Sequence, residues 1–313
     1  MKILLYGATG TIADSVFKIV RNNQSKLKVV AATCNKNFNK LEKLRIKYGI
    51  KKIGINNHKF AEKYKTLYGY SKWDKHLLIG NENFSKLITK DIDVIILAIS
   101  GLSALYVIND IIKSGKIIGL ANKECIISLG PRLILLAKRY KSKIVPLDSE
   151  HNSIYRLLES NKNKFKSITI TASGGPFFNK DKSFLKNVTP NQAIKHPVWK
   201  MGKKISVDSA TMMNKALEII EAKYLFNLHN DQINAVIHPE SIIHAAINFF
   251  DNTSISLLNE PDMRIPLSYL LKVNNSLEKK ENIFQMLDNK SLTFHKINQD
   301  KFPAIKLAFK VLE

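Results

Sequence analysis

Mostly apolar runs alternate with amphipathic segments along the first half of the chain. Five runs have the composition of buried strands: residues 3–6, 28–33, 93–99, 116–120 and 143–146. Helices are predicted at residues 12–22 and 103–113, where apolar positions recur every three or four residues. This alternation is typical of a doubly wound parallel α/β sheet. Residues 51–90 are polar and weakly periodic, and we expect irregular helix and loop there.

The second half of the chain has a different pattern. A strand is predicted at residues 167–172, and three antiparallel strands are predicted at residues 235–237, 242–249 and 254–258. Residues 178–204 between them are polar and have the composition of a long loop, and such loops are often functional lids. The periodicity of residues 303–312 predicts a last helix.

These patterns predict an α/β protein with three parts. Residues 1–150 should form a Rossmann-like nucleotide-binding domain with a doubly wound parallel sheet. Residues 151–275 should form an α+β domain whose long loop 178–204 has the composition of a functional lid. Residues 276–313 read as a linker followed by one helix.

Residues 206–221 predict a single amphipathic helix that Asp208 or Ser209 caps. Four apolar residues share one arc of it: Met213, Leu217, Ile220 and Tyr224. Three polar residues share the opposite arc: Asn214, Lys215 and Glu218. An amide and an ammonium suit a phosphate, and a carboxylate suits a divalent metal. The alternative is a solvated face with a Lys–Glu pair.

Composition narrows the choice of partners. The 313 residues carry 49 Lys and Arg against 26 Asp and Glu, a formal net charge of +23. Because the excess is dispersed and almost all Lys, whereas base-reading proteins favour Arg, we expect no nucleic-acid partner but steering of an anionic substrate. No apolar run is long enough to span a bilayer, so we expect no membrane partner. Two cysteines, Cys34 and Cys125, give no disulfide framework, and we expect a cytoplasmic protein.

A glycine-containing turn follows the first predicted strand. In the segment YGATGTIA at residues 6–13, Gly7 and Gly10 allow close approach of a phosphate to the N-terminus of a helix. The strand at residues 28–33 leads into a segment without an acid, in which Lys36 and Asn37 suit a 2′-phosphate, and this favours NADP over NAD. The alternatives are a turn without a ligand and a surface turn in a Lys-rich protein.

Carboxylates gather at the end of another predicted strand. In PLDSEH, residues 146–151, Asp148 and Glu150 would point the same way in an extended segment at the carboxyl edge of the sheet. With Glu218 they would make an oxygen-rich site for Mg²⁺ or Mn²⁺. The alternative is a helix start with acids near its dipole.

A histidine and a tryptophan stand together in the predicted loop. His196 and Trp199 could close over a substrate, although such a pair more often packs within its own loop.

Together these motifs resemble the 1-deoxy-D-xylulose-5-phosphate reductoisomerase family. The resemblance runs along the whole chain and rests on residues 7–13, 120–124, 146–151, 172–177, 196–199, 201–221, 238–244 and 260–264. It implies conversion of 1-deoxy-D-xylulose 5-phosphate to 2-C-methyl-D-erythritol 4-phosphate with NADPH and Mg²⁺ or Mn²⁺. The metal would act as a Lewis acid for a retro-aldol/aldol rearrangement, and NADPH would reduce the resulting aldehyde. The resemblance also implies a homodimer, formed through the strands between residues 235 and 258.

The resemblance assigns roles to particular residues. Cofactor contacts fall on Gly7, Thr9, Gly10, Thr11, Ile12, Lys36, Asn37, Asn122, Glu124 and Gly202. The metal ligands are Asp148, Glu150 and Glu218. The phosphorylated sugar would be held by Lys123, Ser149, Glu150, Ser173, His196, Trp199, Ser209, Asn214, Lys215 and Glu218. Catalysis would rest on Lys123, His196 and the three metal ligands.

The family normally continues into a C-terminal helical domain, and we expect that domain to be largely absent from this sequence. The apolar stripe of Phe302, Ile305, Phe309 and Leu312 is then expected to lack a partner. A catalytically inactive NADP-binding remnant is therefore the alternative function.

Overall fold

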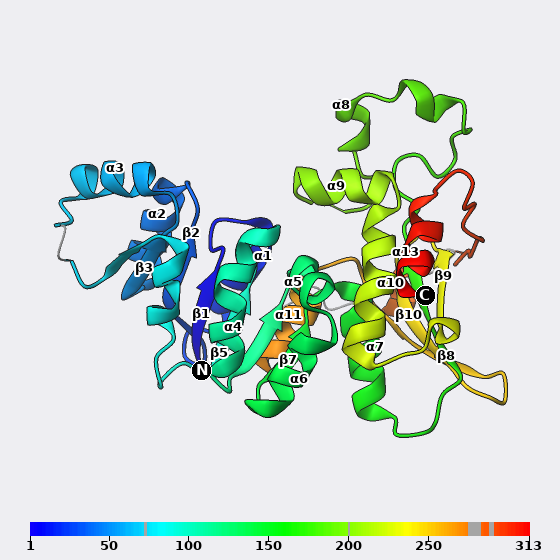
Figure 1. Cartoon of the computed structure of the whole chain (residues 1–313), viewed down its shortest axis with the longest axis horizontal. Coiled ribbons are helices and arrows are strands. Elements are labelled where there is room, and N and C mark those ends of the chain that lie inside the picture. The colour runs from blue at the N-terminus through cyan, green and yellow to red at the C-terminus, as the bar shows by residue number, and fades with distance from the viewer. Residues whose placement is uncertain (72–73, 200, 275–282, 288–290) are drawn as a thin grey trace. The chain divides into compact units, whose positions relative to one another are not determined.

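The structure is a computed structural model that describes residues 1–71, 74–199, 201–274, 283–287 and 291–313 (Figure 1). The chain forms two compact units. The first comprises Met1–Leu147 and Met263–Leu277, and the second comprises Asp148–Asp262 and Glu278–Glu313. Each unit has its own sheet, and each is described by itself.

A parallel sheet of seven strands forms the centre of the first unit. Its strands are β1 (Lys2–Tyr6), β2 (Lys28–Cys34), β3 (Lys52–Ile55), β4 (Leu77–Ile79), β5 (Val94–Leu97), β6 (Ile117–Leu120) and β7 (Lys143–Pro146). They lie in the order β4-β3-β2-β1-β5-β6-β7, and every pairing is parallel. The predicted doubly wound sheet is confirmed, and the strand order reverses between β1 and β5.

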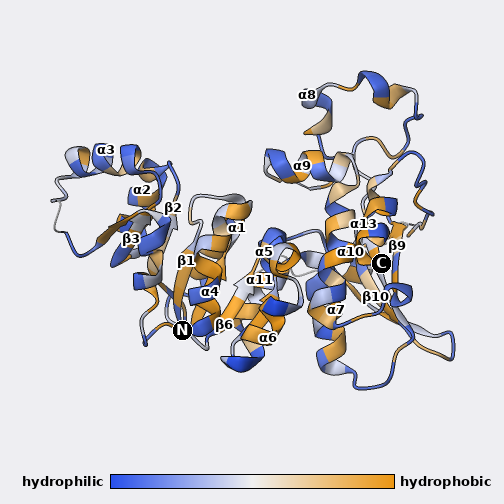
Figure 2. Ribbon diagram, viewed as in Figure 1, coloured by the Kyte–Doolittle hydropathy of each residue, from blue (hydrophilic) through white to orange (hydrophobic). Residues whose placement is uncertain are grey.

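Helices accompany these strands, and all but the last of them lie between two strands of this sheet along the chain. They are α1 (Thr11–Asn22), α2 (Phe38–Tyr48), α3 (His58–Tyr68), η1 (Asn81–Leu87), η2 (Leu102–Ala104), α4 (Leu105–Lys113), α5 (Lys123–Leu129), α6 (Pro131–Arg139) and α11 (Arg264–Leu271). The central strands are orange in Figure 2, and four consecutive residues of β1, Ile3 to Tyr6, have no exposed surface. A strand buried on both faces reads as a continuous apolar run, which is why the sequence predicted it correctly.

The prediction of irregular helix and loop for residues 51–90 missed the strands β3 and β4, although the described part of this segment also holds the helix α3 and the 3₁₀ turn η1. β3 and β4 have only four and three residues, too few to show a period. Gly54 lies within β3, where the Phe84 ring leaves no room for a side chain: an added Cβ would come within 2.6 Å of that ring. The helix α3 had recognisable ends, since Asn57 accepts a hydrogen bond from the N–H of Phe60 and Gly69 ends the helix at φ 70°.

A four-stranded sheet forms the centre of the second unit. Its strands, in the order β11-β10-β8-β9, are β8 (Ser167–Ala172), β9 (Ile233–Ile237), β10 (Ile243–Asn248) and β11 (Ser254–Leu258). β10 pairs antiparallel with β8 and β11, but β9 pairs parallel with β8. The prediction that the strand at residues 235–237 is antiparallel was therefore wrong. The long connection between β8 and β9 provides the crossover that a parallel pair needs.

Several helices belong to this unit. They are α7 (Ser149–Ser160), η3 (Phe184–Asn187), α8 (Pro190–Ala193), α9 (Lys203–Ala210), α10 (Met213–Phe226), η4 (Asn230–Gln232), α12 (Ile283–Met286) and α13 (Ala304–Leu312). α7 packs on β10 and β11, and α10 packs on β9. The described part of residues 178–204 holds only short helical turns until α9 begins, and it is largely hydrophilic (Figure 2). Every helix among the described residues is too short or too polar to cross a membrane.

Residues 206–221 do not form the single helix that we predicted. α9 ends at Ala210, and α10 begins at Met213, because Met212 adopts a left-handed backbone with φ 59°. The chain is constrained at this point by Gly175: an added Cβ there would lie 2.7 Å from the backbone oxygen of Ser209. Gly202, not Asp208 or Ser209, is the N-cap of α9.

The polar arc of α10 is buried, which excludes the solvated face that we left open. Lys215 and Glu218 are only 3% and 0% exposed, and Asn214 is half-buried. The predicted apolar arc is less deeply buried, since Met213 and Leu217 keep part of their surface. The polar side chains of α10 therefore point into the interior of the second unit.

The last helix has a partner, contrary to our expectation. α13 lies along α10 (Figure 1), and Phe302, Ile305 and Leu312 are buried. The carbonyl oxygen of Leu312 accepts hydrogen bonds of 2.9 Å from Lys223 at the end of α10 and from Asn230. The apolar stripe therefore stabilises the helix that carries Glu218.

Candidate functional site

Three carboxylates meet where α7 begins beside α10. Asp148, Glu150 and Glu218 each offer an oxygen, and these oxygens all lie within 4.8 Å of one another. Asp148 is the N-cap of α7, and its Oδ1 accepts the N–H groups of Glu150 at 3.2 Å and His151 at 3.4 Å. Glu150 lies in the first helical turn and not in the extended segment that we predicted. Both interpretations of this segment thus hold: the acids start a helix, and they form a cluster.

A buried ammonium lies against this cluster. The Nζ atom of Lys215 donates to Oε1 of Glu150 at 3.0 Å and to Glu218. Burial lowers the pKa of Lys215, but the charges of Glu150, Glu218 and Asp148 outweigh burial and raise it. Lys215 therefore stays charged and offsets part of the negative charge of the carboxylates.

Two further predicted residues complete this group. Asn214 donates from Nδ2 to Glu218, and Ser149 donates from Oγ to Glu150. The carboxylates, the amide and the hydroxyl supply oxygen ligands alone, and hard divalent cations such as Mg²⁺ and Mn²⁺ prefer oxygen. The residues present therefore fit such an ion.

A second group joins the end of β8 to the loop 178–204. Oγ of Ser173 lies 2.8 Å from Nε2 of His196, and the backbone N–H groups of Val198 and Trp199 donate to its Nδ1 at 3.1 and 2.9 Å. Because Nδ1 accepts, the neutral ring carries its proton on Nε2 and donates it to Ser173. Burial lowers the pKa of His196 to about 4, so the ring is neutral at physiological pH.

The Trp199 ring connects this group to another buried histidine. It meets His244 of β10 edge-on, with ring centroids 6.0 Å apart. Burial lowers the pKa of His244 to about 4, and the charges of Lys215 and Asp148 also affect it. His244 therefore lies near both groups, and our residue-level predictions had left it out. A histidine on a half-buried strand gives no sequence signal that it will lie beside these two groups.

Two other predicted residues of this unit lie on α9. Ser209 is half-buried in its last turn, beside the backbone of Gly175. Gly202 is exposed at its start, and no described atom would touch an added Cβ there. Packing alone therefore does not require glycine at position 202.

The predicted cofactor loop lies at the switch point of the first unit's sheet. Gly7 has φ 84°, and an added Cβ would lie 2.4 Å from the backbone oxygen of Ala98. Gly10 is the N-cap of α1, whose first N–H groups point out of the helix end as a phosphate site requires. Thr9, Thr11 and Ile12 follow the same turn and are at least partly exposed. The residues fit a dinucleotide.

The other predicted cofactor residues lie at neighbouring strand ends of the same unit. Lys36 is exposed, and Asn37 caps α2 by accepting the N–H of Lys40. Asn122 caps α5 and donates from Nδ2 to the carbonyl oxygens of Ile99 and Gly101 at 2.7 and 3.0 Å.

Lys123 and Glu124 follow Asn122 in the first turn of α5 and are half-buried. The two hydrogen bonds that the Asn122 side chain donates to Ile99 and Gly101 hold the ends of β5 and β6 together beside Lys123 and Glu124.

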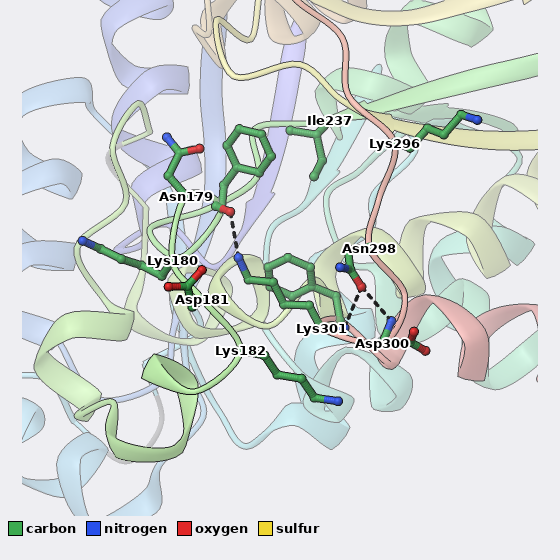
Figure 3. A pocket seen from close by; sticks show the side chains of 11 residues that line it. Asn179, Lys180, Asp181, Lys182, Ile237, Lys296, Asn298, Asp300 and Lys301 are labelled. Atoms are coloured by element: carbon green, nitrogen blue, oxygen red, sulfur yellow. Dashed lines mark hydrogen bonds between the residues drawn. The ribbon is translucent and has the colours of Figure 1, made fainter.

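A pocket of about 410 Å³ lies elsewhere in the second unit (Figure 3). It is lined by residues from the segments 178–182 and 296–302 together with Ile237, and none of them is a predicted site residue. Its Lys180, Lys182 and Lys296 point away from one another in Figure 3. Lys301 donates to the carbonyl oxygen of Phe178 at 2.7 Å, which ties the C-terminal segment to the start of the loop 178–204. The pocket thus has a structural contact but no converging charges.

A parallel sheet with a glycine turn at its switch point, and a second unit with a largely buried carboxylate cluster, are the features expected of a metal-dependent oxidoreductase that uses a nicotinamide cofactor. Models of one family match the chain in three parts. The 1-deoxy-D-xylulose 5-phosphate reductoisomerase model matches residues 3–130, and its two C-terminal domain models match residues 144–226 and 258–313. A 1-deoxy-D-xylulose 5-phosphate reductoisomerase of Wigglesworthia glossinidia brevipalpis is 39% identical over 322 residues, covering 99% of this chain and 81% of that protein. The chain belongs to the 1-deoxy-D-xylulose 5-phosphate reductoisomerase family.

Solved structures agree with this assignment. A DOX-P reductoisomerase in complex with NADPH, fosmidomycin and magnesium superposes with a TM-score of 0.91 at 33% identity, covering 100% of this chain and 79% of that chain. The enzyme from Zymomonas mobilis in complex with NADPH superposes with a TM-score of 0.86 at 30% identity, covering 99% of this chain and 80% of that chain. The predicted family and fold class are therefore confirmed.

Proposed function

We propose that this chain converts 1-deoxy-D-xylulose 5-phosphate into 2-C-methyl-D-erythritol 4-phosphate, with NADPH as reductant and Mg²⁺ or Mn²⁺ as cofactor. The observation that carries the proposal is the cluster of Asp148, Glu150 and Glu218 around the buried Lys215. A simple nicotinamide-dependent reductase would not need three carboxylates at one point. Membership of the family and the complexes of its solved members with NADPH and magnesium support the same activity.

The metal would be held by Asp148, Glu150 and Glu218. When bound, it supplies Lewis acidity to the ketone and hydroxyl oxygens of the substrate. Lys215 orients two of these carboxylates through its hydrogen bonds to Glu150 and Glu218. Among the described residues, its Nζ atom donates to these two groups, which leaves one N–H for a substrate oxygen.

The phosphate group of the substrate would be held by Ser173, Ser209, Asn214 and Lys215, with His196 as a further contact. Oγ of Ser173 accepts from Nε2 of His196 and, at 3.4 Å, from the N–H of Gly175. Its own hydrogen is then directed to another acceptor, such as a phosphate oxygen. A neutral His196 donates without adding charge, and it carries the loop residue Trp199 with it. Phosphate binding would therefore favour closure of the loop.

NADPH would lie on the turn Gly7–Ile12, with Lys36 and Asn37 near its 2′-phosphate and Asn122, Glu124 and Gly202 as further contacts. It supplies the hydride. The close approach of Gly7 to Ala98 supports this placement, because only glycine lets the turn pass so near the neighbouring strand end. Lys123 would contact the substrate from the start of α5, and Ser149 would contact it beside Glu150.

Two coarser proposals concern the whole protein. We propose a homodimer formed through β9, β10 and β11, and light scattering of the purified chain tests it. We also propose a cytoplasmic location, which the two buried free thiols of Cys34 and Cys125 support, and cell fractionation tests it.

Product identification tests the proposed activity. The purified chain should consume one NADPH for each 2-C-methyl-D-erythritol 4-phosphate formed from 1-deoxy-D-xylulose 5-phosphate, with the product measured by mass spectrometry. A folded chain that binds NADPH but forms no product would instead support the inactive remnant.

A further inference from the structure

A buried glutamate and a buried histidine lie behind the carboxylate cluster, and no role has been assigned to them so far. Glu221 is on α10, one turn beyond Glu218, and is 2% exposed. His151 is on α7, next to Glu150, and has no exposed surface. Nδ1 of His151 lies 3.1 Å from Oε2 of Glu221 and 3.5 Å from Oδ1 of Asp148, and its Nε2 lies 3.0 Å from the carbonyl oxygen of Glu218.

The carbonyl contact fixes the orientation of the ring. A carbonyl oxygen only accepts hydrogen bonds, so Nε2 of His151 carries a proton and donates it to Glu218. The Nδ1 edge is then turned toward the carboxylates of Asp148 and Glu221. His151 is thereby held by α10 on both sides, through the backbone of Glu218 and the side chain of Glu221.

Asp148 is in turn constrained at one oxygen. Its Oδ1 accepts the N–H groups of Glu150 and His151 and faces the His151 ring. A carboxylate is planar and rigid, so a constraint on one oxygen sets the direction of the other. His151 and Glu221 therefore influence the geometry of the cluster through the orientation of the Asp148 carboxylate.

We propose that Glu221 is a positioning residue for the divalent cation: it holds His151, and His151 aims the carboxylate of Asp148 at the ion. This inference rests on the proposed metal role of Asp148. A buried charge is costly to desolvate, and an apolar residue of similar size often stabilises a protein as well. The carboxylate at position 221 contributes direction to a ligand, and residues that orient metal ligands typically change metal affinity by about 10–100-fold when they are replaced.

The test is direct binding of Mn²⁺ alone, by electron paramagnetic resonance of the free ion. Glu221→Gln keeps the size of the side chain and removes its charge, and it should raise the Kd for Mn²⁺ by about 10–100-fold. NADPH affinity should stay unchanged, and excess Mn²⁺ should restore kcat. Glu221→Asp, which keeps the charge but shortens the side chain, should give a smaller increase, and it serves if the Gln variant does not fold.

Glu42→Gln is the matched control. Glu42 is also nearly buried, at 4% exposure, but it pairs with Arg45 and Tyr64 in the first unit. This variant should lose stability without a change in Mn²⁺ affinity. If the Glu221 variants bind Mn²⁺ as the wild type does, or change affinity no more than the Glu42 variant, Glu221 is structural and the proposal is wrong.

A double-mutant cycle tests the route through His151. If Glu221 acts through the ring, Glu221→Gln added to His151→Gln should raise the Kd no further than His151→Gln alone. Additive effects would contradict the proposed route. Wild-type protein that binds no Mn²⁺ would instead overturn the metal role of the cluster, which separates failure of the proposed function from failure of this inference.

Discussion

At the scale of residues, the backbone of one glycine separates a cofactor turn from an ordinary turn. Gly7 combines a left-handed φ of 84° with a contact that leaves no room for a Cβ beside Ala98. Gly49 has a similar φ of 61°, but no described atom would lie within 4 Å of its Cβ. Both positions require a left-handed backbone, and they differ only in the room that is available for a side chain.

This difference predicts unequal costs for the same substitution. Gly7→Ala should destabilise the chain by several kcal/mol and weaken NADPH binding more than tenfold, because the added methyl group displaces the turn. Gly49→Ala should cost about 1–2 kcal/mol and leave NADPH affinity unchanged. Urea unfolding and fluorescence titration with NADPH measure both effects. Equal losses of NADPH affinity in the two variants would contradict the placement of the cofactor.

The histidine of the loop gives a second prediction at this scale. Burial lowers the pKa of His196 to about 4, while the unfolded chain titrates near the ordinary value of 6.5. The unfolded state therefore binds more protons between these values, so His196 favours folding above pH 6.5, and this contribution is lost as the pH falls toward 4. An NMR titration of the ring, assigned with His196→Gln, should show the low pKa. Titration near 6.5 would mean that the ring is solvated and does not donate to Ser173 as described.

Residue types with a known chemistry were predictable from the sequence, whereas their supports were not. Asp148, Glu150 and Glu218 were recognisable as candidate metal ligands by type and spacing, and the structure brings their oxygens within 4.8 Å of one another. His151 and Glu221 were not recognisable, because their significance comes from a contact between α7 and α10. In that contact, the ring of His151 meets the carbonyl oxygen of Glu218, which lies 67 positions later in the chain. The signal that existed was weak: Glu221 is a second acidic residue of α10, one turn after Glu218.

At the scale of elements, α10 is the central support of the site, and α13 braces it. The sequence predicted the polar arc of α10 but not its burial, because helix periodicity shows that two faces differ and does not show which face is covered. It also missed the break at Met212, because the close packing of Gly175 on Ser209 is a tertiary contact.

The packing of α13 on α10 predicts different losses of stability for substitutions at two residues of α13. Ile305 is 2% exposed, whereas Leu307 is 53% exposed. Ile305→Ala should destabilise the second unit by about 2–4 kcal/mol, and Leu307→Ala should change stability by less than about 0.5 kcal/mol. Thermal unfolding measures both. Equal effects would mean that α13 does not pack on α10 through this stripe.

At the scale of the whole molecule, the parallel sheet was predictable and the second sheet only in part. Strands buried on both faces, such as β1 and β5, are visible as apolar runs. The direction of β9 was not predictable, because a connection of this length can return a strand either way. The short β3 and β4 at the edge of the first sheet lacked any period.

The proposed function assigns the cofactor to the first unit and a divalent ion, on which turnover should depend, to the second unit. The most direct measurement is the rate of NADPH oxidation with 1-deoxy-D-xylulose 5-phosphate as Mg²⁺ or Mn²⁺ is titrated, for the wild type and for Glu150→Gln. If the ion is required, the rate should rise with metal concentration to a plateau, and a chelator should abolish it. The rate should be at least a hundredfold lower in Glu150→Gln, which should still bind NADPH. Oxidation that persists without metal, or that the variant retains, would contradict the proposed function.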